Sequence, residues 1–524
     1  MRTFLLFIFM SSPFLTMAQS PAIEWQKCMG GTSDDFGNDV IQTSDGGYVF
    51  IGSTNSNDVN VSGRHGVIED VWIVKTDAYG SIQWQKCYGG TGTDVGNSVY
   101  QTTDGGYIAT GYTRSYDYDV IGNHGTPANG RADVWVIKLS SSGGLQWQKC
   151  LGGSSNDYAD CIRQTSDGGY IVFGNTSSTD GDVSGIHSSA PDAWVVKLDS
   201  TGGIEWQKCL GGSSNLDYLH SGQQTQDGNY IAVGETASAD GDAADNHGSV
   251  DAWVIALDTN GIILWEKCYG GSNEESANSI QQTSNGGYVF AGRSRSVDFD
   301  VTFNHGYDDA WLVKIDSTGT IVWQRSMGGS NYDWLNSVAQ TSDHGYVVSG
   351  RTCSADGDVW DNISWTSGDG WFARTDSAGN IIGSQSLGGS GDEYLKSIVQ
   401  TIDGGYITLG YTSSSSNDMD VSGFTGGAYD FWAVKLNTLA SVDAFSFIQN
   451  ITVSPNPGNG KFVFSNLENE CIIEIMDVTG RVINTTNTKA NSCTVDISGK
   501  AKGIYFYSIT DNNKRVQQGK LVIQ

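Results

Sequence analysis

The sequence repeats one phrase about every sixty residues, and this internal period constrains the fold more than any other feature. A Gly-Gly pair recurs seven times at intervals of 58 to 63 residues, at 30–31, 89–90, 152–153, 211–212, 270–271, 328–329 and 388–389. Between successive pairs lie four short apolar segments separated by glycine-containing turns, two of them in "DAWVVKLDSTGGIEWQKCLGG". The sequence therefore predicts an array of units, each built from four short strands.

Aromatic residues recur at fixed places in these units. The composition has 69 Gly, 6 Pro, 16 Trp and 23 Tyr, which is typical of a turn-rich all-β protein. Each third strand carries a Trp and each second strand a Tyr, and wide rings suit a sheet that is buried on both faces. We interpret these rings as core. Four strands per unit with Gly at each reversal is the pattern of a β-propeller blade.

The phase of the repeats predicts a closed ring. The chain opens with the fourth-strand segment "AIEWQKC", and the last unit ends with the third-strand segment "DFWAVKLN". We expect the opening strand to complete the last blade, giving a seven-bladed propeller over residues 21–438 without exposed edges. The turn "LDSTGGIEW" resembles the Asp-x-x-x-Gly-x-x-x-Trp hairpin of pyrroloquinoline-quinone and related propellers, with Asp199, Gly202 and Trp206 in those places. The resemblance implies a Trp docked between blades and does not imply the quinone.

The two ends of the chain differ from the repeats. Residues 1–18, with Arg2 before an apolar run and small residues near Ala18, are expected to be a secretory signal peptide. No later apolar run is long enough to span a bilayer. Residues 439–449 are interpreted as a linker. Residues 450–524, with short alternating strands and Gly turns, predict a small Ig-like β-sandwich.

This last segment closely resembles the type A C-terminal sorting domain of the Bacteroidota type IX secretion system. The matching residues are Pro455, Asn456, Pro457, Asp477, Gly480, Arg481, Gly503, Ile504, Tyr505 and Lys520. The resemblance implies passage through the type IX translocon and processing by its sortase. The cargo is then secreted or held at the outer cell surface, and the sequence leaves these two outcomes open.

The charge balance narrows the choice of partners. The formal net charge is −29, a field that repels nucleic acid and anionic membranes. Cations and neutral polymers such as glycans are compatible with it. We therefore expect no nucleic-acid partner and consider an extracellular glycan as a ligand.

Acidic residues recur on the face that carries the long loops. An acid follows each Gly-Gly pair, and six of the long loops carry an acid pair such as Asp180 and Asp182, with Asp58 and Asn60 in the first loop and a nearby His in five loops. Alternating carboxylates could gather oxygens around Ca²⁺, but the full calcium-loop spacing is missing. We favour the alternative that these Asp residues cap loop N–H groups and that each His is hydrogen-bonded within its loop. No other cofactor is expected, and the metal question stays open.

Repetition fails in the sixth unit, which we take as the place to look for a ligand. Thirteen of the 16 Trp belong to two core ladders, seven on the third strands and six on the fourth strands. The other three lie beside three Asp, and the candidate residues are Trp334, Trp360, Trp365, Asp333, Asp358 and Asp361. Trp rings stack on sugars while carboxylates accept hydroxyl hydrogen bonds; the alternative is a loop that buries its own Trp cluster.

The sequence contains no motif of a known catalytic constellation, and acids repeated in every unit do not single out an active site. We expect a secreted or surface-displayed, non-enzymatic binding protein, with glycans as candidate ligands. One alternative is a carbohydrate-active hydrolase or lyase on the same scaffold, because glycoside cleavage needs only a suitably spaced carboxylate pair. The other is a structural surface protein.

Overall fold

A computed structural model of the chain describes residues 20–187, 191–214, 216–359, 367–438, 452–465, 467, 471–477, 481–511 and 514–524. The chain divides into two compact units, Met1–Leu439 and Ala440–Gln524. The predicted signal peptide (1–18) and linker (439–449) lie outside the described residues. No helix in the described ranges is long and apolar enough to cross a membrane.

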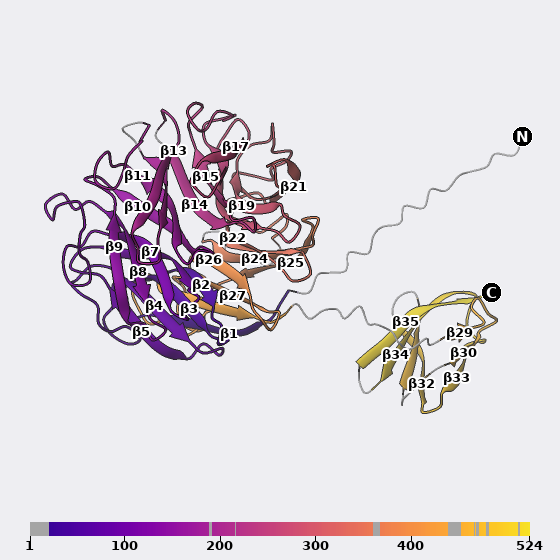
Figure 1. Ribbon diagram of the computed structural model, residues 1–524. Coiled ribbons are helices and arrows are strands. Elements are labelled where there is room, and N and C mark those ends of the chain that lie inside the picture. The colour runs from indigo at the N-terminus through magenta and orange to yellow at the C-terminus, as the bar shows by residue number, and fades with distance from the viewer. Residues whose placement is uncertain are drawn as a thin grey trace, which may run out of the picture. The chain divides into compact units, whose positions relative to one another are not determined.

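Seven antiparallel four-stranded sheets make up the first unit, as the blades of a β-propeller (Figure 1). The innermost, first strands are β2 (Asp35–Gln42), β6 (Asp94–Gln101), β10 (Asp157–Gln164), β14 (Asp217–Gln224), β18 (Glu275–Gln282), β22 (Asp333–Gln340) and β26 (Glu393–Gln400). The second strands are β3 (Tyr48–Thr54), β7 (Tyr107–Thr113), β11 (Tyr170–Thr176), β15 (Tyr230–Thr236), β19 (Tyr288–Ser294), β23 (Tyr346–Thr352) and β27 (Tyr406–Thr412).

The outer half of each blade holds its third and fourth strands. The third strands are β4 (Asp70–Thr76), β8 (Asp133–Leu139), β12 (Asp192–Leu198), β16 (Asp251–Leu257), β20 (Asp309–Ile315), β24 (Asp369–Thr375) and β28 (Asp430–Leu436). The fourth strands are β5 (Ile82–Tyr88), β9 (Leu145–Leu151), β13 (Ile204–Leu210), β17 (Ile263–Tyr269), β21 (Ile321–Met327), β25 (Ile381–Leu387) and β1 (Ile23–Met29). We number the blades 1 to 7 by their first strands.

Strand β1 closes the ring, as the phase of the repeats predicts. It pairs antiparallel with β28, with Cys28 opposite Trp432 and Met29 opposite Phe431, so blade 7 has the order β1-β28-β27-β26. In Figure 1 the indigo start of the propeller accordingly lies beside its orange end. The prediction of a seven-bladed propeller closed by the N-terminal strand is confirmed.

A belt of glutamines joins the blades on the face that carries the tight turns, which we call the lower face. Each first strand ends in a Gln whose side-chain oxygen accepts an N–H from the turn of the preceding blade. Across the seam, Ile402 N–H donates to Gln42 at 2.8 Å. The other six pairs are Ser44–Gln101, Thr103–Gln164, Ser166–Gln224, Gln226–Gln282, Ser284–Gln340 and Ser342–Gln400. The belt runs around the whole ring, which excludes an open superhelix.

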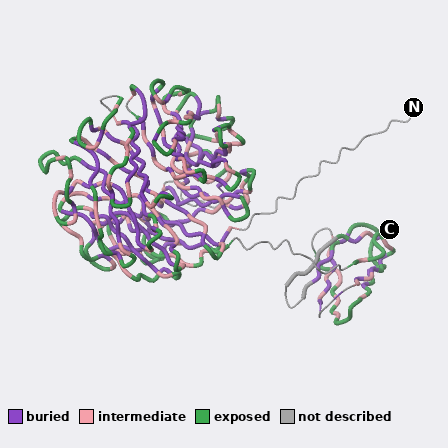
Figure 2. Tube along the Cα trace, in the orientation of Figure 1, coloured by how far each residue is buried: buried purple, intermediate pink, exposed green. Residues whose placement is uncertain are grey.

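The blades share an aromatic core, with buried residues along the strands and exposed ones in the turns and loops (Figure 2). The third-strand Trp residues are at most 2% exposed; the indole N–H of Trp194, for example, donates to Gln207 on the neighbouring strand at 2.8 Å. Fourth-strand Trp residues such as Trp206 pack against the second-strand Tyr of the next blade, here Tyr230, with ring centroids 5.9 Å apart. The predicted docking of Trp between blades is confirmed.

Every first strand carries a β-bulge at its fourth residue, Asn38 in blade 1, which is skipped in the pairing with the second strand. A bulge re-aims its side chain, here into the central channel. The second strand needs Gly at this level: a Cβ on Gly234 would lie 1.8 Å from the carbonyl oxygen of Tyr218. The equivalent glycines of the other blades are Gly52, Gly111, Gly174, Gly292, Gly350 and Gly410.

The second unit is a small β domain of two sheets. Strands β29 (Thr452–Ser454), β30 (Lys461–Ser465) and β33 (Ser492–Asp496) form one sheet. Strands β32 (Val482–Thr488), β31 (Cys471–Met476), β34 (Gly503–Asp511) and β35 (Lys514–Ile523) form the other. Phe462 and Phe464 from the first sheet share a core with Ile473, Ile475 and Tyr507 from the second, as a sandwich requires.

Candidate ligand-binding site at the channel mouth

The acid that follows each Gly-Gly pair is part of the fold. In blade 6, Asp333 is fully buried, and its carboxylate accepts hydrogen bonds from Gly329 N–H (2.8 Å), Thr352 (2.5 Å) and Ser354 (2.7 Å). The equivalent acids of the other blades accept the same glycine N–H at 2.7–3.1 Å. We therefore leave Asp333 out of any ligand-contacting surface.

The paired acids of the long loops act on the face opposite the lower face, which we call the upper face. The first member caps the crossing between blades: Asp180 accepts Ser154 N–H at 2.7 Å. The second lies near the loop histidine of the preceding blade: the Asp182 carboxylate is 3.7 Å from His124 Nε2. Within the described residues, no cluster of three or more His, Cys, Asp or Glu could hold a metal ion.

Each loop histidine is tied to the first Asp of its third strand. The Nδ1 atoms of His65, His124, His187, His247 and His305 lie 2.6–3.0 Å from that carboxylate. Thr425 takes this place in blade 7 and donates through its N–H and its hydroxyl to Asp430. These contacts agree with the hydrogen-bonded role that we favoured from the sequence.

A second buried acid stands near each of these carboxylates, at the start of the next first strand. Burial raises the pKa of Asp70, Asp94 and Asp133 to about 6 and that of Asp430 to about 7, and repulsion from a neighbouring acid adds to the shift of Asp94, Asp133 and Asp430. These pairs belong to the blade junctions rather than to an open cleft.

The candidate residues of blade 6 separate into three groups. Trp360, Asp361 and Trp365 lie outside the described residues. Asp358 is half-buried and accepts Gly328 N–H at 3.3 Å. Trp334 is half-buried on β22, at the inner rim of the upper face, next to the channel.

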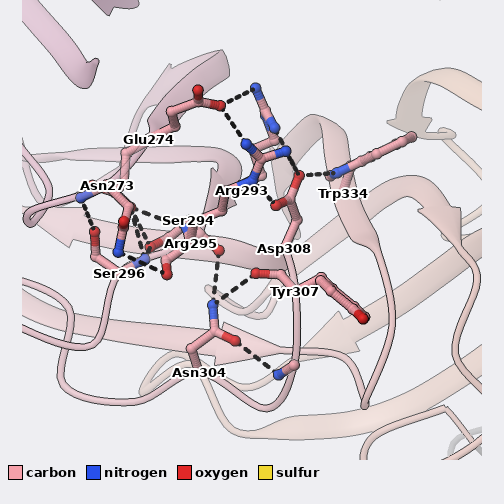
Figure 3. A network of polar contacts seen from close by, with 12 residues as sticks. Asn273, Glu274, Arg293, Ser294, Arg295, Ser296, Asn304, Tyr307, Asp308 and Trp334 are labelled. Carbon is pink, nitrogen blue, oxygen red and sulfur yellow. Dashed lines mark hydrogen bonds and ion pairs between the residues drawn. The ribbon is translucent and has the colours of Figure 1, made fainter. Parts of the chain in front are cut away.

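Trp334 ends a network of charges that links blades 5 and 6 (Figure 3). Its indole N–H donates to Asp308 at 3.0 Å, and the same carboxylate receives Arg293 at 2.7 Å and also Arg295. Burial works against the charge of Asp308, but the bonds from Arg295 and Trp334 outweigh it and hold its pKa below the ordinary value. Glu274 pairs with both arginines on the far side. The hydrogen bond to Asp308, which the arginines hold in place, restrains the orientation of the Trp334 ring.

From Trp334 a row of aromatic side chains continues around the upper rim of the channel. We call this row the aromatic arc; it consists of Tyr307, Tyr332, Trp334, Arg351, Tyr394, Tyr411, Tyr429 and Phe36. Tyr307 stacks on Tyr332, with centroids 5.0 Å apart, and Tyr332 lies 6.2 Å from Trp334. Tyr307 is 63% and Tyr332 36% exposed, so this end of the arc is open to solvent.

The arc crosses from blade 6 to blade 1 through further ring contacts. The Arg351 guanidinium lies 4.1 Å from the centroid of Tyr394 and 5.9 Å from that of Trp334. Tyr394 stacks on Tyr411 at 4.8 Å, and Tyr411 meets Phe36 edge-on at 5.2 Å. These residues are half-buried, so their exposed parts present a curved aromatic surface beside the channel.

Below this rim the channel is lined by the bulge residues of the first strands. Asn38, Asn97, Asn278 and Asn336 donate from their side-chain amides to a backbone carbonyl of the next blade at 2.8–3.0 Å. In the other three blades the bulge residue is not Asn but Asp160, His220 or Lys396. Asp160 accepts a hydrogen bond from His220 Nδ1 at 2.9 Å. Together with residues deeper in the strands they enclose a cavity of about 380 Å³.

These three residues were not among the candidates found from the sequence. The signal was present, since they stand three residues after the acid that begins each first strand, where four other repeats have Asn. Only the bulge, however, shows that this slot faces the channel.

The C-terminal unit uses its matched residues for its own architecture. The Asn456 side chain donates to Lys520 C=O at 2.6 Å and accepts Val522 N–H at 3.0 Å, so it clamps the last strand. Asp477 pairs with Arg481 at 3.1 Å, and the Tyr505 hydroxyl donates to Ala501 C=O at 2.8 Å. Pro455, Pro457, Gly503 and Ile504 are described, whereas Gly480 lies outside the described residues.

Among solved structures, the chain resembles the extracellular domain of a hybrid two-component system from B. thetaiotaomicron at 10% identity and a TM-score of 0.41, covering 96% of this chain and 60% of that one. It resembles PorZ, a surface component of the type IX secretion system of Porphyromonas gingivalis, at 10% identity and a TM-score of 0.33, covering 92% and 73%. It resembles Sqt1 from Chaetomium thermophilum at 12% identity and a TM-score of 0.40, covering 79% of this chain and 100% of that one. At such identities and TM-scores these likenesses carry no argument about function.

No curated protein matches the chain. Residues 452–524 match the family model described as "Secretion system C-terminal sorting domain". This match confirms the sorting domain that the sequence resembles and, with it, secretion to the outer surface. The chain therefore consists of a seven-bladed propeller followed by a type IX secretion sorting domain.

Proposed function

We propose that the protein is a secreted or surface-displayed binding protein whose propeller binds extracellular glycans on the aromatic arc. The arc itself carries this proposal, because the repeats do not require it. The slot that holds Trp334 and Tyr394 in blades 6 and 7 is also aromatic in blades 1, 3 and 4, with Phe36, Tyr158 and Tyr218. Blades 2 and 5 have Val95 and Ser276 there and the same fold, so the fold does not require a ring in this slot.

The chemistry of the arc suits sugars. Tyr and Trp faces stack on the apolar faces of pyranose rings, while guanidinium and carboxylate groups bond to hydroxyls at the edges. Arg351 sits between two rings and pairs with Asp392, which places both kinds of group beside the aromatic surface. The network around Asp308 holds Trp334 in one orientation before a ligand arrives, which lowers the entropy cost of binding.

Glycan-array binding followed by calorimetry on the selected glycan tests this function. We expect Tyr307→Ala and Trp334→Ala each to weaken binding by about 3- to 10-fold, because each removes one stacking ring. Tyr79→Ala is the matched control, since Tyr79 is 74% exposed in a lower-face turn. Unchanged affinity in both arc variants would rule out the arc as the site.

The same experiment separates the two alternatives. Turnover of an array-selected glycan would favour the hydrolase or lyase. Absence of binding to any glycan, together with self-association of the protein, would favour a structural surface component.

A further inference from the structure

In three blades the bulge residue of the first strand, which faces the channel, carries an ionisable group that the fold does not need. Asn in this slot gives an inter-blade hydrogen bond without charge, as Asn278 does with Leu335 C=O at 2.8 Å. Asp160, His220 and Lys396 replace it in blades 3, 4 and 7 and bring ionisable groups into a partly buried cavity. Charges in such a place cost stability unless they are paired.

Two of the three charges balance each other. Asp160 accepts from His220 Nδ1 at 2.9 Å and from the Asn97 amide at 3.2 Å. Burial in the channel disfavours the charge on His220, but the hydrogen bond and charge of Asp160 outweigh it, so the pKa of His220 is raised. This pair therefore places at the cavity wall an imidazole whose protonated form is favoured by Asp160.

Lys396 has no such partner. It forms no ion pair within the described part of the chain, and the ring centroid of Tyr411 lies 5.9 Å from its Nζ. Burial lowers the pKa of its ammonium group, and the charge of Asp160 acts in the opposite direction. An ammonium group in this setting is stabilised when an anion enters the cavity.

Lys396 connects the cavity, which it lines, to the arc, whose Tyr411 ring lies beside it. Tyr394 and Lys396 are two residues apart on β26, and the Tyr411 ring faces both side chains. The cavity of about 380 Å³ falls within the size range of small-molecule sites. Arg163, deeper in the channel, donates to Ser98 and to a backbone carbonyl, and its charge is offset by the carboxylate of Asp39, which also lines the cavity.

We propose that the channel holds a single anionic group of a bound saccharide, a carboxylate or a sulfate ester, with Lys396 as its direct partner and the His220–Asp160 pair beside it. This inference rests on the proposed glycan function and specifies its ligand as an acidic sugar. The net charge of −29 opposes polyanions at long range, so a sugar with one anionic group fits better than a densely charged polymer.

Titration of the mature full-length protein with glucuronate, glucose 6-sulfate and glucose, followed by calorimetry and ligand-observed NMR, tests the proposal. We expect one of the two anionic sugars to bind roughly 10- to 100-fold more tightly than glucose, which identifies the anionic group. Lys396→Asn should abolish this preference, and it should fold because it restores the residue found in four other blades. Lys208→Asn, which removes the same charge from an exposed outer-strand position, should retain it.

Equal binding of all three sugars, no binding of either anionic sugar, or a preference that survives in Lys396→Asn would overturn the proposal. A different result would overturn the proposed function of the arc. If the arc variants bind array-selected glycans like the unmodified protein while Lys396→Asn loses the anionic sugar, the channel site stands and the arc is wrong.

Discussion

Single residues set how closely the strands of a blade approach. The second-strand glycines lie against the carbonyl that precedes the bulge, and for Gly234 an added Cβ would be 1.8 Å from Tyr218 O. The strand would have to move, and with it the bulge that aims His220 into the channel. A backbone contact thus connects the blade core to the channel wall.

We expect Gly234→Ala to lower the free energy of unfolding by roughly 2–4 kcal/mol, because the methyl group would overlap a backbone oxygen that cannot turn away. Gly144→Ala is the control, since its Cβ would meet only the flexible Ser140 hydroxyl, at 3.1 Å. Denaturant unfolding of both variants measures the difference. Equal stabilities would show that the second strand has room for a side chain.

The loop histidines provide a second test at this scale. His247 donates its backbone N–H to Asp251 at 2.8 Å, and its ring lies 2.9 Å from the same carboxylate. His247→Leu should cost about 1–3 kcal/mol because the buried carboxylate loses a partner. His247→Thr should cost less, since Thr425 fills this role in blade 7. A Thr variant as unstable as the Leu variant would contradict the assignment.

At the scale of strands and blades, the repeats predicted nearly everything that depends on burial. The Trp and Tyr ladders, the turns and the closure by β1 all follow from apolar periodicity and phase, because one blade cannot cover its own faces. The acids were harder to interpret. From the sequence, Asp333 was a candidate ligand contact, whereas in the structure its carboxylate accepts three hydrogen bonds within the fold. The sequence alone does not distinguish a carboxylate that caps a loop from one that is free to bind a ligand.

The arc and the channel wall could be predicted only in part. Trp334 stood out as a Trp outside the ladders, but the hydrogen-bond acceptor of its indole, Asp308, comes from blade 5, and the next ring of the arc, Tyr394, comes from blade 7. Lys396 broke a pattern that is visible in the sequence, yet its direction depends on a bulge that periodicity does not reveal. A site whose side chains come from several blades cannot be recognised in the sequence of any single repeat.

The closing strand gives the prediction at this scale. Deleting residues 20–29 removes β1, exposes the edge of β28 and takes away Gln26, which accepts the Trp432 indole N–H at 2.9 Å. We expect the unfolding temperature to fall by roughly 10 °C or more and the protein to associate through the open edge. Calorimetry measures the unfolding temperature, and light scattering measures the association.

Deletion of Ala440–Gln524, a separate compact unit, is the control and should leave the unfolding transition of the propeller in place. An unchanged transition without β1 would contradict closure.

For the whole molecule, the buried acids at the blade junctions set the response to pH. Asp35, Asp70, Asp94 and Asp133 have pKa values raised to about 6, and Asp430 to about 7, mainly by burial. The folded state therefore binds these protons more tightly than the unfolded state, whose Asp pKa values are near 3.8. Their contribution to stability is complete below about pH 4 and is lost as pH rises through 6 to 7.

We expect the unfolding temperature to be higher at about pH 5 than at about pH 8, as scanning calorimetry can measure. Below about pH 4 it should fall again: burial opposes the charge of Asp45, but hydrogen bonds from Thr43 and Lys75 lower its pKa to about 2, and that stabilisation is lost on acidification. Asp430→Asn should flatten the difference between pH 5 and pH 8. Greater stability at pH 8 than at pH 5 would contradict the pairing of buried acids.

In the described part of the propeller, the upper rim from blade 5 to blade 1 brings together stacked aromatic rings, Arg351 and the Lys396 ammonium group. The most direct test is a crystal structure of the protein with the saccharide that binds most tightly in the array. We predict sugar rings over Trp334 and Tyr394 on the upper face, with an anionic group within hydrogen-bonding distance of Lys396 Nζ. A saccharide bound on the outer strands, on the lower face or on the C-terminal domain, with the arc left bare, would contradict the account.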